Sequence, residues 1–549
     1  MAPLKRQRKL PTSRSPGPTL IRASVVILFL GCGATSPRPV ALTSAEPFRS
    51  IYQKEPSFET AMDGSFATGI TFADMNGDGM PDLVVANGND MSPQPLMVYT
   101  NHCSPQQSSC FASYPEWYSG DFDYQANVAV GDIDHDGWLD VAVCVPLDKS
   151  RRSQGGSVKV YMNKKGVLEP LPSQRIGAGY GTFACTFADV NADGLLDLVV
   201  AAFNSPPSSL AVMPSTVLRS VRAGTPERAH IYLNEGGRLH TTSDWNSDNR
   251  MFAFSTLAAD LDQDGWMDVA MGTERVFTYR GSAPSGPHVP IASAPAWTSE
   301  ATQGLALSID AGSIPPAPHA APGASDAPLT LAVSRGCIPG ESNCTSDFAL
   351  FRPNSGPSPV WKSIPNHLGA MLLLADLNDD HLLDLVGGQW GDHVQGGPLW
   401  FFQGQLGGTF SSEPDFRTAG SGSALPGAGA GAGAVAEGLM VADTRCRAIS
   451  ERNFTFRPKG RGAVITLPDR RVASIVSVTV AGRNIPPSEW AFAVGQNWIS
   501  LARPYEPNTD IQIIYRASPV QDLVEATWSP TRGNLFFDSF LTAQTRPGK

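Results

Sequence analysis

Residues 69–88 read GITFADMNGDGMPDLVVANG, and this stretch decides the fold. A β-branched apolar segment leads into nine residues of the form D-x-[DN]-x-D-[GH]-x-x-D, and a second apolar segment follows. We call the nine-residue element the acidic loop. It occurs five times, beginning at Asp74, Asp132, Asp189, Asp260 and Asp376. A unit that recurs along a chain is typical of a repeat architecture.

The spacing of the copies predicts one further repeat. Consecutive loops begin 58, 57, 71 and 116 residues apart, so the last gap holds two units. Within it, GLALSID, ending at Asp310, and LTLAVSRG, residues 329–336, supply a first and a second strand without an acidic loop. Each unit adds a third strand, such as LMVYTN at residues 96–101, and the second strands are apolar enough for burial on both faces. Three or four short strands per unit match a propeller blade.

The amino-acid composition favours an all-β chain that binds cations. The 549 residues include 53 Gly and 46 Pro, only 17% are charged, and the formal net charge is -10. Many turn residues and few charges favour a β protein over a helical or disordered one. Because phosphate binding needs a basic face, the acidic balance argues against a nucleic-acid partner.

The loops and their flanking strands resemble the FG-GAP repeat, called the VCBS repeat in bacteria, of the integrin α-chain propeller. The resemblance covers about Phe58 to Phe410. Seven blades are usual in that family, which implies an all-β propeller of about seven blades. We expect the seventh at Gly438 to Phe456, where GLMVAD echoes a first strand and FTFRP a third.

Calcium is the expected cofactor, at up to five sites. Ca²⁺ takes about six to eight oxygen ligands, which an alternating acidic loop around a glycine can deliver. The predicted ligands are the side chains at loop positions one, three, five and nine and the carbonyl of position seven. They are Asp74, Asn76, Asp78, Met80 and Asp82; Asp132, Asp134, Asp136, Trp138 and Asp140; Asp189, Asn191, Asp193, Leu195 and Asp197; Asp260, Asp262, Asp264, Trp266 and Asp268; and Asp376, Asn378, Asp380, Leu382 and Asp384.

The fifth copy has His381 where the others have glycine at position six. A side chain makes a left-handed turn costlier, so this site should be the weakest. An EF-hand would need Glu at position twelve, where the copies have Val, Met or Gly. A turn of Asp, Asn and Gly without metal is the remaining alternative.

The N-terminal segment predicts export. Basic residues precede the apolar run Ala23 to Leu30, which is too short to span a bilayer, and Cys32 follows. The end of the run resembles the bacterial lipoprotein processing box, which implies lipidation of Cys32 and an outer-membrane or cell-surface location. Simple secretion or a periplasmic location is the alternative. The only membrane contact expected is through this anchor.

Cysteine spacing agrees with an oxidising compartment. Cys103 with Cys110, and Cys337 with Cys344, each enclose six residues, a spacing that allows a disulfide within a loop. Cys144 and Cys185 lie on strand-like segments, where buried free thiols and a disulfide are both possible. Cys446 has no obvious partner in the sequence.

The partner surface is expected on the face opposite the acidic loops, where the loops between second and third strands are long. Positive charge gathers there at Lys149, Arg151, Arg152, Arg219, Arg222 and Arg228, and Trp390, Asp392 and His393 offer a sugar-stacking platform. A protein or a polysaccharide is the expected ligand. Solvated loops without a ligand are the plain alternative, and a monomer is expected.

The domain prediction has four parts. Residues 1–32 form the export signal, 33–57 a linker, 58–458 the propeller and 459–549 a small β-sandwich-like domain. The last part contains short alternating strands with the turn segments IPPSEW and PYEPNTD, and it resembles accessory Ig-like modules of exported proteins.

The sequence favours a surface binding or adhesion module, and no catalytic residue is predicted. An alternative is a polysaccharide lyase or hydrolase on a calcium-bearing propeller, although the chain has neither HExxH nor GxSxG. A cluster of His, Lys and Tyr in the central funnel would indicate that enzyme. A scaffold subunit of an envelope complex is the third reading.

Overall fold

A computed structural model of the chain consists almost entirely of β-strands. The residues it describes are 48–61, 64–88, 92–103, 110–147, 156–177, 179–203, 226–286, 288–301, 304–314, 329–336, 346–366, 369–389, 397–405, 407–419, 436–527 and 532–540.

Six four-stranded antiparallel sheets follow one another along the chain, and we number them blades one to six. Their first strands are β2 (Ala67–Ala73), β6 (Asn127–Gly131), β10 (Gly181–Ala188), β16 (Ser255–Ala259), β20 (Leu305–Gly312) and β24 (Gly369–Ala375). Their second strands are β3 (Asp82–Asn87), β7 (Asp140–Val145), β11 (Asp197–Phe203), β17 (Asp268–Gly272), β21 (Thr330–Gly336) and β25 (Asp384–Gln389). All six second strands are buried along their whole length, as the apolar runs predict.

The third strands are β4 (Met97–Tyr99), β8 (Ser157–Tyr161), β12 (His230–Tyr232), β18 (Val276–Tyr279), β22 (Asp347–Phe351) and β26 (Trp400–Phe402). The outer strands are β5 (Trp117–Tyr118), β9 (Gln174–Ile176), β15 (Trp245–Asn246), β19 (Trp297–Thr298), β23 (Trp361–Lys362) and β27 (Phe416–Arg417). Five of these six outer strands begin with Trp or Phe, a recurrence that could have located them from the sequence. A short hairpin, β13 (Asn234–Glu235) with β14 (Arg238–Leu239), extends blade three.

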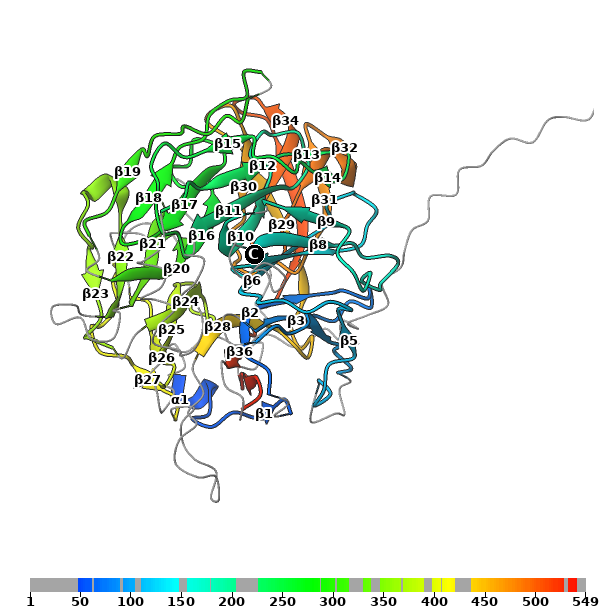
Figure 1. Cartoon of the computed structure of the whole chain (residues 1–549). Coiled ribbons are helices and arrows are strands. Elements are labelled where there is room, and N and C mark those ends of the chain that lie inside the picture. Colours follow the sequence, from blue (N-terminus) through cyan, green and yellow to red (C-terminus); the bar gives the residue numbers. More distant parts are fainter. Residues whose placement is uncertain are drawn as a thin grey trace, which may run out of the picture.

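Blade seven joins the two ends of the described chain. Its strands, from the centre outward, are β28 (Ala436–Ala442), β36 (Asp522–Thr527), β37 (Leu535–Phe537) and β1 (Phe58–Glu59). Each first strand lies against the first strand of the next blade, and β28 lies against β2. The seven sheets therefore surround one centre, in chain order from blue to yellow in Figure 1.

A small β-sandwich is inserted into blade seven between β28 and β36; we call residues 450–517 the inserted module. One sheet has the order β29 (Ser450–Phe456), β35 (Ile511–Ala517), β31 (Ser474–Val480) and β32 (Arg483–Ile485). The other has β30 (Gly462–Thr466), β34 (Trp498–Tyr505) and β33 (Trp490–Ala491). Buried side chains of both sheets, including Ile465, Ile499 and Ile513, share one core.

The expected propeller, its seven blades and the β-sandwich are confirmed, but the strands divide differently from the predicted boundaries. FTFRP, expected as the third strand of blade seven, belongs mostly to β29, which pairs with β35 in the inserted module. Residues 522–537, expected in the C-terminal domain, supply β36 and β37 of the propeller instead. Strand pairing between residues far apart in sequence decided both points.

The predicted linker also differs at its C-terminal end. Phe48 and Ile51 of helix α1 (Phe48–Ile51) and the following Tyr52 are buried against blades six and seven. The ring centroids of Phe48 and Phe401 are 5.5 Å apart, and the Tyr52 hydroxyl donates to the Gln521 carbonyl at 2.6 Å. These residues are therefore part of the propeller's packing.

Candidate functional site

Each acidic loop is organised by its own carboxylates. In blade one, Asp74 Oδ1 accepts from the Gly77 and Asp78 amides at 2.8 and 3.0 Å, and Asp74 Oδ2 accepts from the Gly79 amide at 2.9 Å. Asp78 Oδ1 accepts from the Met80 amide at 2.8 Å. The amides of positions five, six and seven donate comparable hydrogen bonds to the loop carboxylates in all five loops. These bonds turn the side chains at positions one, three and five toward a common centre.

Acidic side chains gather in three of the described loops, and in blade six the group is Asp376, Asp379 and His381, of which only Asp376 is a predicted ligand. In blade two, Asp132, Asp134 and Asp136 offer oxygens that all lie within 4.8 Å of one another. In blade four, Asp260, Asp262 and Asp268 do the same. Hard oxygen ligands at this separation fit a divalent cation such as Ca²⁺.

The position-nine aspartate has a second task that the sequence analysis missed. In blade one, Asp82 Oδ2 accepts from the Met75 amide at 2.9 Å and Asp82 Oδ1 from the Asn101 amide at 2.8 Å. Asp82 thereby connects Met75, just after the first strand, to Asn101, two residues after the third strand. The equivalents Asp140, Asp197, Asp268 and Asp384 make the same two bonds. A carboxylate has about four lone-pair sites, so both oxygens keep room for a cation.

An asparagine after the third strand links neighbouring blades. Asn163 Nδ2 donates to the Met75 carbonyl of blade one at 2.8 Å, and Asn234 Nδ2 donates to the Ile133 carbonyl of blade two at 2.9 Å. Asn101 Nδ2 reaches the Thr444 carbonyl of blade seven at 2.7 Å and so ties blade one to blade seven. The sequence carried this signal, since three third strands end in Y-x-N.

Burial disfavours the charged form of several loop carboxylates. It is the largest cause that raises the pKa of Asp82, Asp140 and Asp268 to about 7 and that of Asp260 to about 8, and nearby carboxylates act in the same direction. Backbone amides act in the opposite direction. Burial likewise raises the pKa of Asp189 to about 7, with the Asp193 charge as the next cause. A divalent cation would supply the missing positive charge.

Position six takes a left-handed conformation in every loop. Its φ is 87° at Gly79 and 85° at Gly194, and His381 adopts 70° in the fifth copy. The histidine therefore carries the conformational cost that the sequence predicted. Position four is left-handed too, at Gly77, His135, Ala192, Gln263 and Asp379, which the sequence analysis did not anticipate.

Blade seven keeps two of the loop aspartates without the loop. Asp443 follows β28 as position one, and Asp522 begins β36 as position nine. Asp522 accepts from the Thr444 amide at 3.1 Å and the Ser539 amide at 2.8 Å, the pattern of the other blades. Arg447 pairs with both carboxylates, at 3.3 Å from Asp443 Oδ1 and in direct contact with Asp522 Oδ1. A guanidinium here supplies the positive charge between them.

The inserted module lies on the acidic-loop face, because it occupies the place of the loop in blade seven. Ser500 Oγ lies 2.8 Å from Oδ2 of Asp189, a predicted ligand of blade three. The Gly265 carbonyl of blade four accepts from the Ala463 and Val464 amides at 2.8 and 3.0 Å. At Gly265 an added Cβ would lie 2.9 Å from the Gly462 Cα, so that contact needs glycine. Two acidic loops thus form part of the docking surface.

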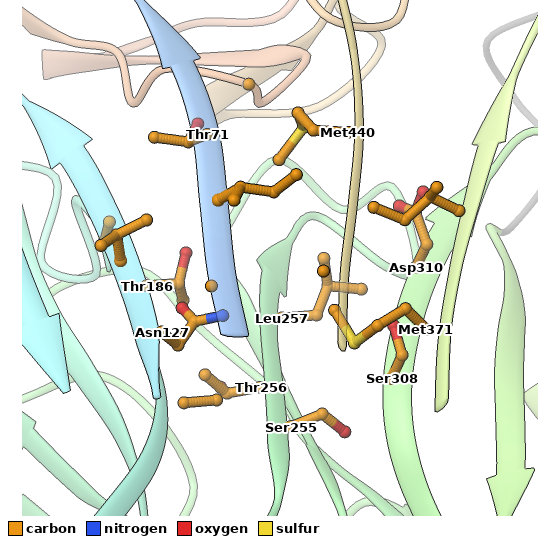
Figure 2. A pocket seen from close by; sticks show the side chains of 18 of the residues that line it. Thr71, Asn127, Thr186, Ser255, Thr256, Leu257, Ser308, Asp310, Met371 and Met440 are labelled. Atoms are coloured by element: carbon orange, nitrogen blue, oxygen red, sulfur yellow. The ribbon is translucent and has the colours of Figure 1, made fainter. Parts of the chain in front are cut away.

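The first strands and the inserted module enclose a cavity of about 260 Å³ in the central channel. Figure 2 shows Thr71, Asn127, Thr186, Thr256 and Asp310 around it. The module forms one end through Arg470, Arg471 and residues 493–497. Among the described residues that line this cavity there is no His, Lys or Tyr.

Asp310, expected at the end of a first strand, lies within β20, where its pairing with Ala332 places it level with Thr71 and Thr186. Blade five therefore has a channel-facing aspartate and no acidic loop. Thr330 stands at position nine.

Two disulfides lie among the described residues. Cys103 and Cys110 are bonded, which confirms that prediction, and Cys144 and Cys185 join blade two to blade three. The expected pair Cys337 and Cys344, the lipidation candidate Cys32, the platform residues Trp390, Asp392 and His393, and the basic residues Lys149, Arg151, Arg152, Arg219 and Arg222 lie outside the described residues. Arg228 is described, and its guanidinium donates to the Asp248 carbonyl at 3.0 Å.

Comparison with known families identifies the repeat. A family model described as FG-GAP-like repeat matches residues 74–143 and 148–200, which contain the first three acidic loops. These residues therefore carry FG-GAP-like repeats, and the chain is similar to integrin α chains.

Proteins similar to the chain include integrin alpha-PS5 of Drosophila melanogaster, 27% identical over 32% of the chain and 19% of that protein. Integrin alpha-3 of Mus musculus is 27% identical over 20% of the chain and 12% of that protein. Integrin alpha-7 of Homo sapiens is 32% identical over 21% of the chain and 9% of that protein. The matches thus cover less than one fifth of each relative's length. Within the described residues, no helix has the length and apolarity needed to cross a membrane.

Proposed function

We propose that this protein is an exported, calcium-stabilised propeller that acts as a binding or adhesion module for a protein or polysaccharide at the cell surface. The observation that carries the proposal is that acidic side chains, some of them buried, come together in several acidic loops of a ring of blades. The FG-GAP repeats and the similarity to integrin α chains support the adhesive role. Anchoring through Cys32 is part of the same proposal.

Calcium acts as a structural ion in this proposal. Each loop joins a first to a second strand, and the loops of blades three and four also contact the inserted module. A bound cation would fix these strands and leave the opposite face rigid. Loops held on a rigid scaffold are the usual place for recognition.

Binding of the full chain to a glycan array and to extracellular-matrix proteins, in calcium and in EDTA, tests the proposal. We expect calcium-dependent binding to at least one acidic glycan or protein. Replacing Lys149, Arg151 and Arg152 together by Gln should weaken that binding, while the same change at Arg457, Arg461 and Arg503 of the inserted module should not. Equal binding in calcium and EDTA, or equal loss in both triple variants, would contradict it.

A further inference from the structure

The central cavity contains a positive charge that its own lining does not balance. Asp310, Arg470 and Arg471 are the ionisable residues among those that line it. One carboxylate facing two guanidinium groups leaves a net charge of about +1, because arginine stays protonated in proteins. The chain as a whole has a net charge of -10, so this excess is local.

Of the two arginines, Arg470 makes the closer contact with the Asp310 carboxylate. Its guanidinium contacts Asp310 Oδ1 and the Ala311 carbonyl directly. Arg471 donates to the Gly495 carbonyl at 3.0 Å but lies 3.5 Å from Asp310 Oδ2, at the limit of a hydrogen bond. Arg470 is thus paired, and Arg471 is the cation with spare capacity.

The Nε edge of Arg471 lacks a close partner. Among the described residues, Nε is buried and makes no hydrogen bond, and Nη2 makes only the long contact with Asp310. Burial lowers the pKa of Arg471, Asp310 raises it, and the Arg470 charge lowers it again. A planar pair of N–H donors on one edge matches a carboxylate in bidentate geometry.

The rest of the lining suits hydroxyl groups. Thr71, Thr186 and Asn127 line the cavity, and each carries a hydroxyl or amide group (Figure 2). Thr256 Oγ1 is buried and makes no hydrogen bond with another described residue. Met371 and Met440 add apolar surface between these groups. At about 260 Å³ the cavity is slightly smaller than drug-sized pockets of about 300–1,000 Å³, so it suits a single small molecule.

We propose that the central channel binds a small hydroxylated monocarboxylate of sugar-acid type, with its carboxylate on Arg471 and its hydroxyl groups facing Thr256, Thr186 and Asn127. The ligand's single negative charge balances the excess in the cavity. This site is separate from the acidic loops and from the opposite face, so it goes beyond the function proposed above.

Isothermal titration calorimetry of the full chain in calcium buffer tests the site, with D-glucuronate as probe and D-glucose as its neutral counterpart. We expect saturable glucuronate binding and at least about tenfold weaker binding of glucose, because only the acid can pair with the guanidinium. Arg471→Gln should weaken glucuronate binding by about tenfold or more. The matched control Arg503→Gln, on the exposed side of β34 with a side chain 74% exposed, should leave binding unchanged.

Thr256→Val keeps the shape of the side chain, removes its hydroxyl and should weaken glucuronate binding several-fold. If Arg471→Gln fails to fold, the Thr256→Val variant still tests the proposed site. Wild-type protein that binds no glucuronate, or a folded Arg471→Gln variant that binds as tightly as wild type, would overturn the proposal. Acetate that binds as tightly as glucuronate, together with an unchanged Thr256→Val variant, would overturn the sugar-acid assignment.

Discussion

Blades one and seven hold the same two aspartates by different means. In blade one, Asp74 and Asp82 begin and end an acidic loop of nine residues, and in the function proposed above a bound calcium ion supplies the positive charge. In blade seven, Asp443 and Asp522 flank the inserted module, and the Arg447 guanidinium lies between them. The position-nine bonds to backbone amides are the same in both. In blade seven the positive charge comes from Arg447, and in blade one the proposed calcium ion would supply it.

The largest expected effect is that of chelation on the loop-bearing blades. EDTA should lower the melting temperature markedly, because each site contributes about 1.4 kcal/mol when free calcium is tenfold above its Kd. Differential scanning calorimetry in calcium and in EDTA measures this. Magnesium at the same concentration serves as control, since it prefers a smaller octahedral site. A melting transition that is unchanged in EDTA would contradict calcium binding by the acidic loops.

Arg447→Met should destabilise the protein by about 3–5 kcal/mol, because it leaves two buried carboxylates without a positive partner. Calcium should not restore this loss, while it should still raise the melting temperature of the variant by the wild-type increment. Urea unfolding with and without calcium measures both quantities. The matched control Arg457→Met, at an exposed pair with Asp510, should change little. Full rescue by calcium would mean that blade seven can also hold the metal.

The stabilising effect of calcium on the loop-bearing blades should depend on pH, because protons and calcium compete for the same carboxylates. The loop aspartates have folded pKa values of about 7 to 8 against about 3.9 when unfolded, so without calcium they favour folding below about pH 4. That stability is lost as pH rises through 7 to 8. Calcium should reverse the trend, and its effect on the melting temperature should grow from pH 5 to pH 8. Melting curves across this range that show a constant calcium effect would contradict the assignment.

The smallest effect is expected in blade six. His381→Gly should stabilise the calcium-bound protein by about 1–2 kcal/mol, because glycine adopts the left-handed conformation without a Cβ clash. It should also tighten the weakest site. Calcium titration by calorimetry detects the change, and Gly265→Ala in blade four should have the opposite sign. A histidine that binds the cation itself would instead make His381→Gly weaken the site.

Much of this architecture could be read from local patterns. The acidic loops, their strands and the loopless repeat at residues 305–336 follow from residue types at short, fixed distances. The shape of each loop is a local matter as well, because the loop's own side chains bond its own backbone. The role of Asp82 toward Asn101 was harder to see, since the second bond joins segments 19 residues apart.

Distant pairing was beyond local patterns. FTFRP alternates like a blade strand, but β29 pairs with β35, 55 or more residues later. β1 closes blade seven against β37, more than 470 residues away. Arg447 between Asp443 and Asp522 depends on the inserted module bringing β36 back beside β28.

The sequence by itself determined that the chain is a ring of blades with five acidic loops, because the repeated residue types act within one loop or one strand. The tertiary structure alone decided how the ring closes, which cation serves blade seven and where the inserted module meets Asp310. Those outcomes depend on charged side chains and strand edges that are far apart in the sequence and come into contact only in the folded chain. The spacing of residues in the sequence does not predict such contacts.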